Sequence, residues 1–259
     1  MLKRTPLYLL FFLFCGLINA QIMLPAYQGA YHAKRTVSDG DGSTSATAAT
    51  SAFQIKMDYP ASTDGVYWIK NANINGGIAF QIYADMTTDG GGWTLVLNYL
   101  HKGGTNPELV VKTSSFPIQG STSLGTDESA TIANWGHLAP ATLNAMPFTQ
   151  LRFYGKTSFH TRIIHFKTTH ANTITYFKTG TGSMTGIAGS YTALTGHTAY
   201  LPASTASYWT SQGNYAMTNF PFWLSGTYHW GIKGGGNRWE VDDMNGNYGY
   251  QTFHQIWVR

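Results

Sequence analysis

Three acidic residues lie close together near the C-terminus and give the chain its most obvious chemistry. Glu240, Asp242 and Asp243 fall within one short stretch, and Asn245 and Asn247 follow in the same loop. Clustered carboxylates repel one another unless a cation joins them, and Ca²⁺ binds carboxylate and amide oxygens. The pattern therefore predicts a calcium site. The alternative is a solvated turn in which Asp and Asn bond their own backbone.

Aromatic residues surround this acidic loop in the sequence. Their rings offer apolar faces that pack against a sugar ring as well as against a protein core. We expect some of them to line a ligand pocket, with Trp239, Tyr248 and Tyr250 as the candidates, and the others to lie in the core. The full set is Trp230, Trp239, Tyr248, Tyr250 and Trp257.

Three histidines at steps of five residues, His160, His165 and His170, do not predict a zinc site. Such steps place successive residues on opposite faces of a strand and far apart around a helix, so no common ligand face results. Asp127 and Glu128 form a further acidic pair, which we interpret as an exposed loop rather than as part of a cation site.

The sequence contains none of the short motifs of common hydrolases, phosphate-binding loops or dinucleotide-binding enzymes. Its only glutamates are Glu108, Glu128 and Glu240, so a glycosidase would have to pair one of them with an aspartate. We therefore predict a binding protein and not an enzyme.

Alternating apolar and polar residues predict the strands that must position these groups. We expect a mostly antiparallel α+β domain with long loops and few short helices, of which 140–146, between two prolines, is the clearest. The predicted strands cover residues 79–83, 94–99, 151–155, 162–168, 173–178 and 252–259.

The N-terminus has the pattern of a secretory signal peptide. Lys3 and Arg4 precede an apolar run at 7–17, and Ala20 is a small residue suited to cleavage. The run is too short to span a bilayer, so we expect no transmembrane anchor and a secreted, cell-surface or periplasmic protein. Removing residues 1–20 also removes Cys15, the only cysteine, which excludes disulfides and thiol chemistry in the mature chain.

After this cleavage 14 basic side chains remain against 12 acidic ones, and charged residues make up 11% of the whole sequence. A balance this small and scattered excludes nucleic acids as partners. Residues 21–51 are small and polar, which predicts a linker or stalk. Apolar residues recur from Ala52 to Arg259 without a second linker, so we expect one domain there.

One stretch carries a family resemblance. Three glycines at 90–92 precede Trp93. They imply a backbone that either has positive φ or passes very close to another segment of the chain, with the Trp93 indole packed over it. The surrounding pattern resembles the start of the fibrinogen C-terminal-like domain, in its intelectin-like branch, and implies that fold for residues 52–259. The matching residues are Asp64-Gly-Val-Tyr-Trp-Ile-Lys and Phe80-Gln-Ile-Tyr-Ala-Asp-Met-Thr-Thr-Asp-Gly-Gly-Gly-Trp-Thr-Leu-Val.

The resemblance also places two cysteines of that family at Ala52 and Ala84, so both partners of a bridge are replaced together. Small apolar residues at both places keep a packable contact without redox chemistry. We predict that the two Cα atoms lie within about 7 Å of each other.

A second similar segment runs from 226 to 240 and implies that His229 and Glu240 are ligands of the family's calcium and sugar site. Two further ligand positions of the family hold Gly226 and Tyr228 here. Since calcium takes six to eight oxygens, these replacements weaken its binding. His229 is thus either a ligand or a buried histidine bonded to backbone.

The resemblance implies an exported, lectin-like protein that binds terminal glycan hydroxyls with the help of Ca²⁺. The alternative is a non-enzymatic module for protein binding or cell-surface adhesion on the same scaffold, so the expected partners are glycans or surface proteins. On the lectin hypothesis the cation is held by Glu240, Asp242, Asp243 and Asn245, and the ligand is bound by His229, Trp239, Tyr248 and Tyr250.

Overall fold

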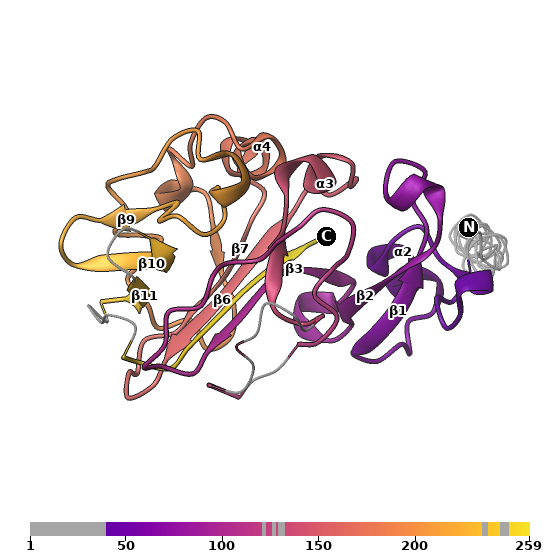
Figure 1. The fold of residues 1–259 in the computed structure, drawn as a ribbon, viewed down its shortest axis with the longest axis horizontal. Coiled ribbons are helices and arrows are strands. Elements are labelled where there is room, and N and C mark those ends of the chain that lie inside the picture. Colours follow the sequence, from indigo (N-terminus) through magenta and orange to yellow (C-terminus); the bar gives the residue numbers. More distant parts are fainter. Residues whose placement is uncertain (1–39, 121–122, 126–127, 129–132, 235–237, 244–248) are drawn as a thin grey trace, which may run out of the picture. The chain divides into compact units, whose positions relative to one another are not determined.

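A computed structural model describes residues 40–120, 123–125, 128, 133–234, 238–243 and 249–259 (Figure 1). The predicted signal peptide at 1–20 and residues 21–39 of the predicted linker lie outside this part of the chain. Within it, no helix is both long enough and apolar enough to cross a membrane. The described residues from 40 onward belong to one compact unit.

The main sheet has nine strands and follows the order β1-β2-β3-β12-β6-β7-β8, with β5 beside β3 and β4 beside β5. All its strand pairs are antiparallel except β4 with β5. The strands are β1 (Gly65–Ile69), β2 (Phe80–Asp85), β3 (Trp93–His101), β4 (Val111–Lys112), β5 (Gly136–Leu138), β6 (Leu151–Thr157), β7 (Ile164–Thr168), β8 (Thr192–Ala193) and β12 (Thr252–Val258).

A second, smaller sheet of three antiparallel strands has the order β11-β10-β9 (Figure 1). It consists of β9 (Trp223–Leu224), β10 (Tyr228–Gly234) and β11 (Arg238–Asp242). The helices are short: α2 (Ala52–Asp58), α3 (Pro140–Asn144) and α4 (Ala171–Thr179), with 3₁₀ turns at Ser45–Thr47, Asn75–Gly77, Thr88–Gly90, Ile187–Gly189 and Gly213–Tyr215. The predicted class, a mostly antiparallel α+β fold with few short helices, is confirmed.

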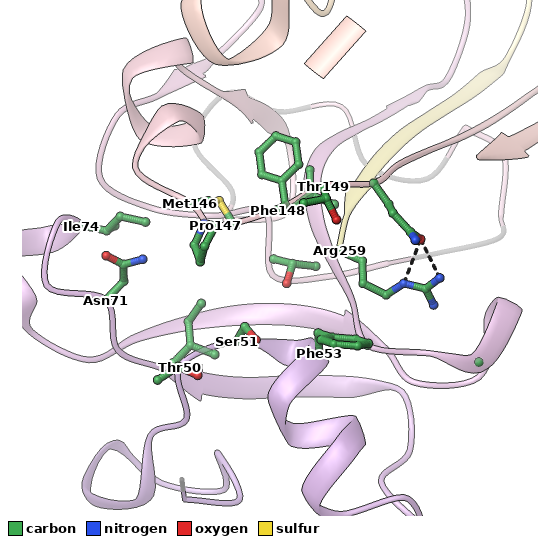
Figure 2. A pocket seen from close by; sticks show the side chains of 16 residues that line it. Thr50, Ser51, Phe53, Asn71, Ile74, Met146, Pro147, Phe148, Thr149 and Arg259 are labelled. Atoms are coloured by element: carbon green, nitrogen blue, oxygen red, sulfur yellow. Dashed lines mark hydrogen bonds between the residues drawn. The ribbon is translucent and has the colours of Figure 1, made fainter. Parts of the chain in front are cut away.

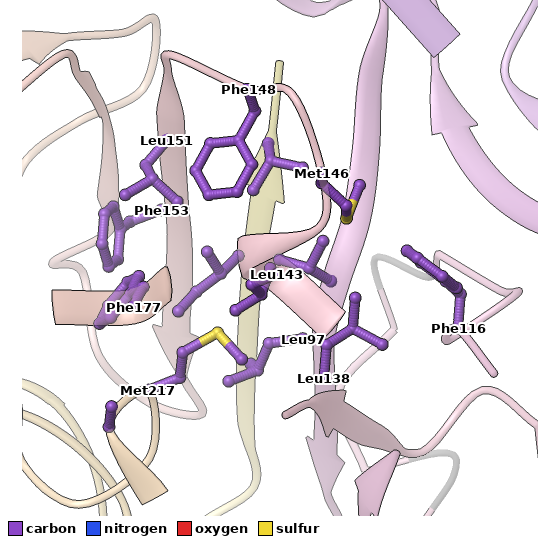
Figure 3. Packing of buried hydrophobic residues seen from close by; sticks show 14 of the residues in the cluster. Leu97, Phe116, Leu138, Leu143, Met146, Phe148, Leu151, Phe153, Phe177 and Met217 are labelled. Carbon is purple, nitrogen blue, oxygen red and sulfur yellow. The ribbon is translucent and has the colours of Figure 1, made fainter. Parts of the chain in front are cut away.

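Side chains alternate along each strand, and the main hydrophobic core lies on one face of the main sheet, while a small cluster of Trp93, Leu95 and Trp257 lies on the other. In β6, Leu151 and Phe153 point into the main core, while Arg152 and Tyr154 belong to the opposite face. Figure 3 shows how helix α3 and the segment after it add Leu143, Met146 and Phe148 to this core.

The glycine run before Trp93 is confirmed as a tight turn. All three glycines have positive φ, and a Cβ atom at Gly91 would lie 2.2 Å from the carbonyl oxygen of Met86. Only glycine fits such a backbone without strain. The turn places the buried Trp93 indole at the start of β3, where its Nε1 donates a hydrogen bond to the carbonyl of Thr88 (2.9 Å).

The prediction of a strand at 173–178 is wrong, since helix α4 covers these residues. Threonine and isoleucine in alternation favour a strand locally. The buried side chains, however, are Thr173, Tyr176 and Phe177, which follow the helical spacing of three and four residues. Gly180, with a φ of 69°, then ends the helix in the left-handed conformation.

The folded unit begins before Ala52, the domain boundary that the sequence predicts. Ala49 is buried in the core and forms a parallel bridge with Ile69, and Thr44 caps the turn before it. Residues 40–51 therefore pack with the domain and do not act as a linker. Ala52 and Ala84 are both fully buried in the same core cluster, while the distance between their Cα atoms stays a prediction.

Candidate functional site

The hairpin of β10 and β11 brings His229 and Glu240 together. In its register His229 lies opposite Asp242, and Gly231 lies opposite Glu240, so all four positions are on one face. Because Gly231 has no side chain, the imidazole of His229 reaches diagonally across the pair. Its Nδ1 lies 3.0 Å from Oε2 of Glu240, and both side chains are buried.

An aromatic cavity of about 210 Å³ opens beside this pair. Trp223 of β9 lies opposite His229, and its ring centroid is 5.9 Å from that of Trp209, which is 44% exposed. The other walls are an edge-on Phe220 and the side chain of Arg238. We call this cavity, lined by Trp209, Phe220, Trp223, His229 and Arg238, the aromatic cavity.

Glu240 lies behind the cavity wall and has no exposed surface. Its Oε1 is 3.5 Å from Nε of Arg238, while neither of its oxygens forms a well-aligned hydrogen bond with the described residues. Burial raises the pKa of Glu240 to about 7, partly offset by the Arg238 charge. Burial and the same arginine lower the pKa of His229 to about 4. The imidazole is therefore neutral at pH 7 and can both donate and accept a hydrogen bond.

Two further predicted metal ligands, Asp242 and Asp243, contact other residues than Glu240 does. Asp242 is fully buried, and its carboxylate accepts hydrogen bonds from the backbone N–H groups of Tyr200 (3.0 Å) and Leu201 (2.8 Å). Asp243 contacts Nε2 of His160 at 2.7 Å and Nε of Arg162 at 3.3 Å.

This second group resembles a metal site in composition, since ligand atoms of His160, Asp242 and Asp243 all lie within 4.8 Å of one another. A cation is already present there, because the Arg162 guanidinium lies over the Tyr200 ring (3.5 Å) and beside both carboxylates. The arginine offsets the repulsion that made a metal attractive on sequence grounds.

The predicted calcium ligands thus divide between two places. Glu240 has a neutral imidazole and a guanidinium as its neighbours, and Asp242 is bonded to backbone, whereas calcium takes six to eight oxygens. The described side chains alone supply fewer oxygen ligands than calcium takes, and the calcium site stays a prediction. Asn245, like Tyr248 and Asn247, lies outside the described residues.

Of the predicted ligand-binding aromatics, the two that the structure describes, Trp239 and Tyr250, do not line the aromatic cavity. Trp239 is fully buried, with its ring stacked on His101 at 4.3 Å, because it faces the opposite side of β11 from Glu240. Tyr250 is partly exposed and lines none of the cavities described here.

Sequence reasoning missed Trp209, Phe220, Trp223 and Arg238, which line the cavity with His229. The first three come from the long segment between β8 and β10, which has no motif or periodic pattern. The only available signal was the aromatic content of this segment, in which Trp209 follows Tyr208 and Trp223 lies between Phe222 and Leu224.

A larger cavity, about 570 Å³, lies elsewhere, between helix α2 and the segment 146–150 (Figure 2). Its apolar walls include Phe53 and Phe148, and Arg259 closes one side through two hydrogen bonds to Oε1 of Gln150 (3.2 and 2.7 Å). Arg259 is the only ionisable residue among the described lining residues, so the cavity offers apolar contact and hydrogen bonds but no acid–base pair.

No known family model matches the chain. Among solved structures, the fibrinogen-like globe domain of human ANGPTL2 is similar, with 14% sequence identity and a TM-score of 0.36. The similarity covers 80% of this chain and 97% of that domain.

Proposed function

We propose that the protein is an exported, non-enzymatic carbohydrate-binding protein on a fibrinogen-like scaffold, and that the aromatic cavity holds a terminal sugar of a glycan. The scaffold assignment rests on the sequence motif from Asp64 to Val96 and on the mostly antiparallel fold. Export rests on the predicted signal peptide.

One observation carries the proposal: Trp209, partly exposed, lies beside Trp223 with its ring tilted by 40°, and His229 and Arg238 line the same small cavity. Aromatic rings pack against the apolar C–H face of a sugar, while a few placed polar groups bond its hydroxyls and fix its orientation. The guanidinium of Arg238 is a hydrogen-bond donor that is always charged, and the neutral imidazole of His229 can donate or accept a hydrogen bond.

Glu240 contributes to this site through its neighbours. Since it is fully buried, it positions His229 and Arg238 and has no direct access to a ligand. Calcium assistance stays a prediction from the family resemblance, because the described side chains fall short of a calcium donor set. We assign no part of the proposed sugar contact to a metal.

A glycan array tests the proposal. The mature chain, residues 21–259, is applied in calcium and again in chelator, with competition by the free monosaccharide. We expect binding to terminal neutral sugars that the monosaccharide displaces. Equal binding in chelator would reject the calcium prediction alone, whereas a folded protein that binds nothing on the array would reject the carbohydrate function.

A second candidate function, the binding of a protein partner, is favoured by the cavity in Figure 2. Phe53, which is 46% exposed, lines it beside the buried Phe148 and Met146, so an apolar side chain of a partner would find walls on several sides. Panning a displayed peptide library on the protein tests this. Enrichment of peptides with a large apolar anchor, lost in Phe53→Ala but kept in Phe159→Ala, would support it.

A further inference from the structure

The face of the main sheet opposite the main core carries a third, separate cavity. On this face Arg152 of β6 lies opposite Trp257 of β12, and Tyr154 lies opposite Gln255 of β12 and His165 of β7. A sheet face that does not pack on the core is normally polar and solvated. Here it instead combines large rings with a buried charge.

This sheet-face cavity has a volume of about 480 Å³. Its aromatic walls include Tyr83, Tyr154 and Trp257, with Tyr83 and Trp257 at a centroid distance of 6.1 Å. It shares no lining residue with the aromatic cavity. The two cavities are therefore separate.

Arg152 forms part of the lining, although only 2% of it is exposed. Its guanidinium carbon lies 5.1 Å from the Trp93 ring centroid and 4.6 Å from that of Trp257, and Nη1 is 2.7 Å from Oδ2 of Asp85. Its Nε has no hydrogen-bond partner among the residues that the structure describes. A guanidinium has five N–H donors, so this buried group retains capacity for acceptor oxygens.

Acceptors and hydroxyls lie on the other walls. The carboxylate of Asp64 accepts hydrogen bonds from Met86 N (2.7 Å) and from the hydroxyl of Thr87 (3.2 Å), and it lines the cavity. The phenol groups of Tyr83 and Tyr154 line it as well. The cavity thus offers one hydrogen-bond donor, the Arg152 guanidinium, and one acceptor, the Asp64 carboxylate. It also offers two tyrosine hydroxyls, each of which can donate and accept.

The charges select the class of ligand. An anionic ligand would face the Asp64 and Asp85 carboxylates, and a cationic ligand would face the Arg152 guanidinium. A neutral polyol is compatible with all three, because each hydroxyl can donate to a carboxylate or accept from a guanidinium. Its apolar C–H faces would pack against Trp257 and Tyr154.

We infer that the sheet-face cavity is a second sugar-binding site, specific for a neutral pyranose unit of a glycan. The inference rests on the proposed function in that it takes the ligand class to be a glycan. Two separate sites on one chain allow a branched or long glycan, or a glycan-covered surface, to be held with higher avidity than either site provides.

Site-resolved NMR tests the inference. The indole N–H signals are assigned with Trp→Phe variants, and the mature chain is titrated with maltopentaose, cellopentaose and mannopentaose, then with glucuronic acid and choline as charged probes. We expect a neutral oligosaccharide to shift the Trp257 signal in a saturable way. We also expect the charged probes to shift it less at equal concentration.

The double variant Tyr83→Phe/Tyr154→Phe keeps both rings and removes only the two hydroxyls. We expect it to weaken binding at the Trp257 signal about tenfold or more, while Tyr215→Phe, outside both cavities, leaves it unchanged. A Trp257 signal that never shifts, shifts more with a charged probe, or saturates equally in the double variant would overturn the inference. Failure of the proposed function would be read separately, from the Trp209 and Trp223 signals.

Discussion

Nδ1 of His229 and Oε2 of Glu240 lie 3.0 Å apart on two adjacent strands, and both side chains are buried. Burial acts in opposite directions on the two groups: it raises the pKa of Glu240 to about 7 and lowers the pKa of His229 to about 4. Both groups thus favour their neutral forms in the folded protein. This gives the pair a definite signature in the pH dependence of stability.

We expect Glu240→Gln to become more stable relative to the wild type as the pH rises from about 4.5 to 7. Because the pKa of Glu240 is raised in the folded protein, its contribution to wild-type stability is fully present at a pH below the pKa of the unfolded state. This contribution is lost as the pH rises through the pKa of the folded state. The difference corresponds to roughly 3 kcal/mol at most. Urea unfolding of both proteins at several pH values measures it, with Glu108→Gln as the control for loss of one negative charge.

The stability contribution of His229 depends on pH in the opposite direction. Because its pKa is lowered in the folded protein, the contribution is present at a pH above the pKa of the unfolded state and is lost as the pH falls toward about 4. Between about pH 4.5 and 6.5 the contributions of Glu240 and His229 to the stability of the wild type therefore change in opposite directions. A parallel pH dependence of the wild type and Glu240→Gln over this range would show that Glu240 is ionised in the folded protein, contrary to its raised pKa.

Trp209→Ala should reduce sugar affinity at the aromatic cavity about tenfold or more, since it removes the partly exposed ring of the Trp209–Trp223 pair. The change in melting temperature should be small, because little of this ring packs against the core. Isothermal titration with the best glycan of the array measures the affinity. Phe159→Ala, which removes a ring that is 97% exposed and outside the cavity, is the matched control.

Gly231→Ala should destabilise the protein by about 1–3 kcal/mol. The same substitution should also change the shape of the aromatic cavity. A Cβ atom there would lie 2.4 Å from Cε1 of Phe220, which forms a cavity wall. Thermal unfolding measures the cost. Gly189→Ala, where a Cβ atom meets nothing within 4 Å, should be nearly neutral, and equal effects of the two substitutions would contradict the assigned packing.

Asp85→Asn should cost about 3 kcal/mol or more at pH 7, since it leaves the buried Arg152 guanidinium without its carboxylate. Burial acts to raise the pKa of Asp85, but the Arg152 charge and hydrogen bonds from Thr88 outweigh it and lower the pKa to about 2. The wild type therefore loses this stabilisation as the pH falls from about 4 toward 2. Chemical unfolding should show the two proteins converging over this range, and a constant difference would contradict the ion pair.

Asp242→Ala should destabilise the protein by about 1–3 kcal/mol, because two backbone N–H groups, of Tyr200 and Leu201, would lose their acceptor. Asp243→Ala should cost less, since its partners His160 and Arg162 are partly exposed. Differential scanning calorimetry with and without calcium separates this structural role from a metal site. A calcium-dependent rise in the wild-type melting temperature that either variant removes would favour the metal site.

Local sequence patterns determined much of the fold. Positive φ at Gly90, Gly91 and Gly92 follows from the glycine run before Trp93, because no other residue type adopts that backbone freely. Alternation of apolar and polar residues, although imperfect in β3 and β12, also predicted β3, β6 and β12, since a period of two is a property of the strand alone. Alternation failed at 173–178, where the spacing of the buried residues decided for helix α4.

The acidic cluster near the C-terminus was visible in the sequence, but its chemistry was decided by tertiary contacts. Glu240 meets His229 across a hairpin, whereas Asp242 meets backbone N–H groups of Tyr200 and Leu201, about forty positions earlier in the chain. Sequence proximity fixes which residues are neighbours on the strand. It does not fix which partners the rest of the chain brings to each face.

Both cavities depend on residues that are distant in sequence. The aromatic cavity joins Trp209 and Trp223 to His229 and Arg238, and the sheet-face cavity joins Arg152 to Asp85 and Trp257. The sequence alone determined that the chain would form a sheet-rich domain with clustered acids and many rings. Only the folding of β6 beside β12, and of β9 beside β10, decided which rings and charges share a cavity, because strand pairing sets the neighbours on a face.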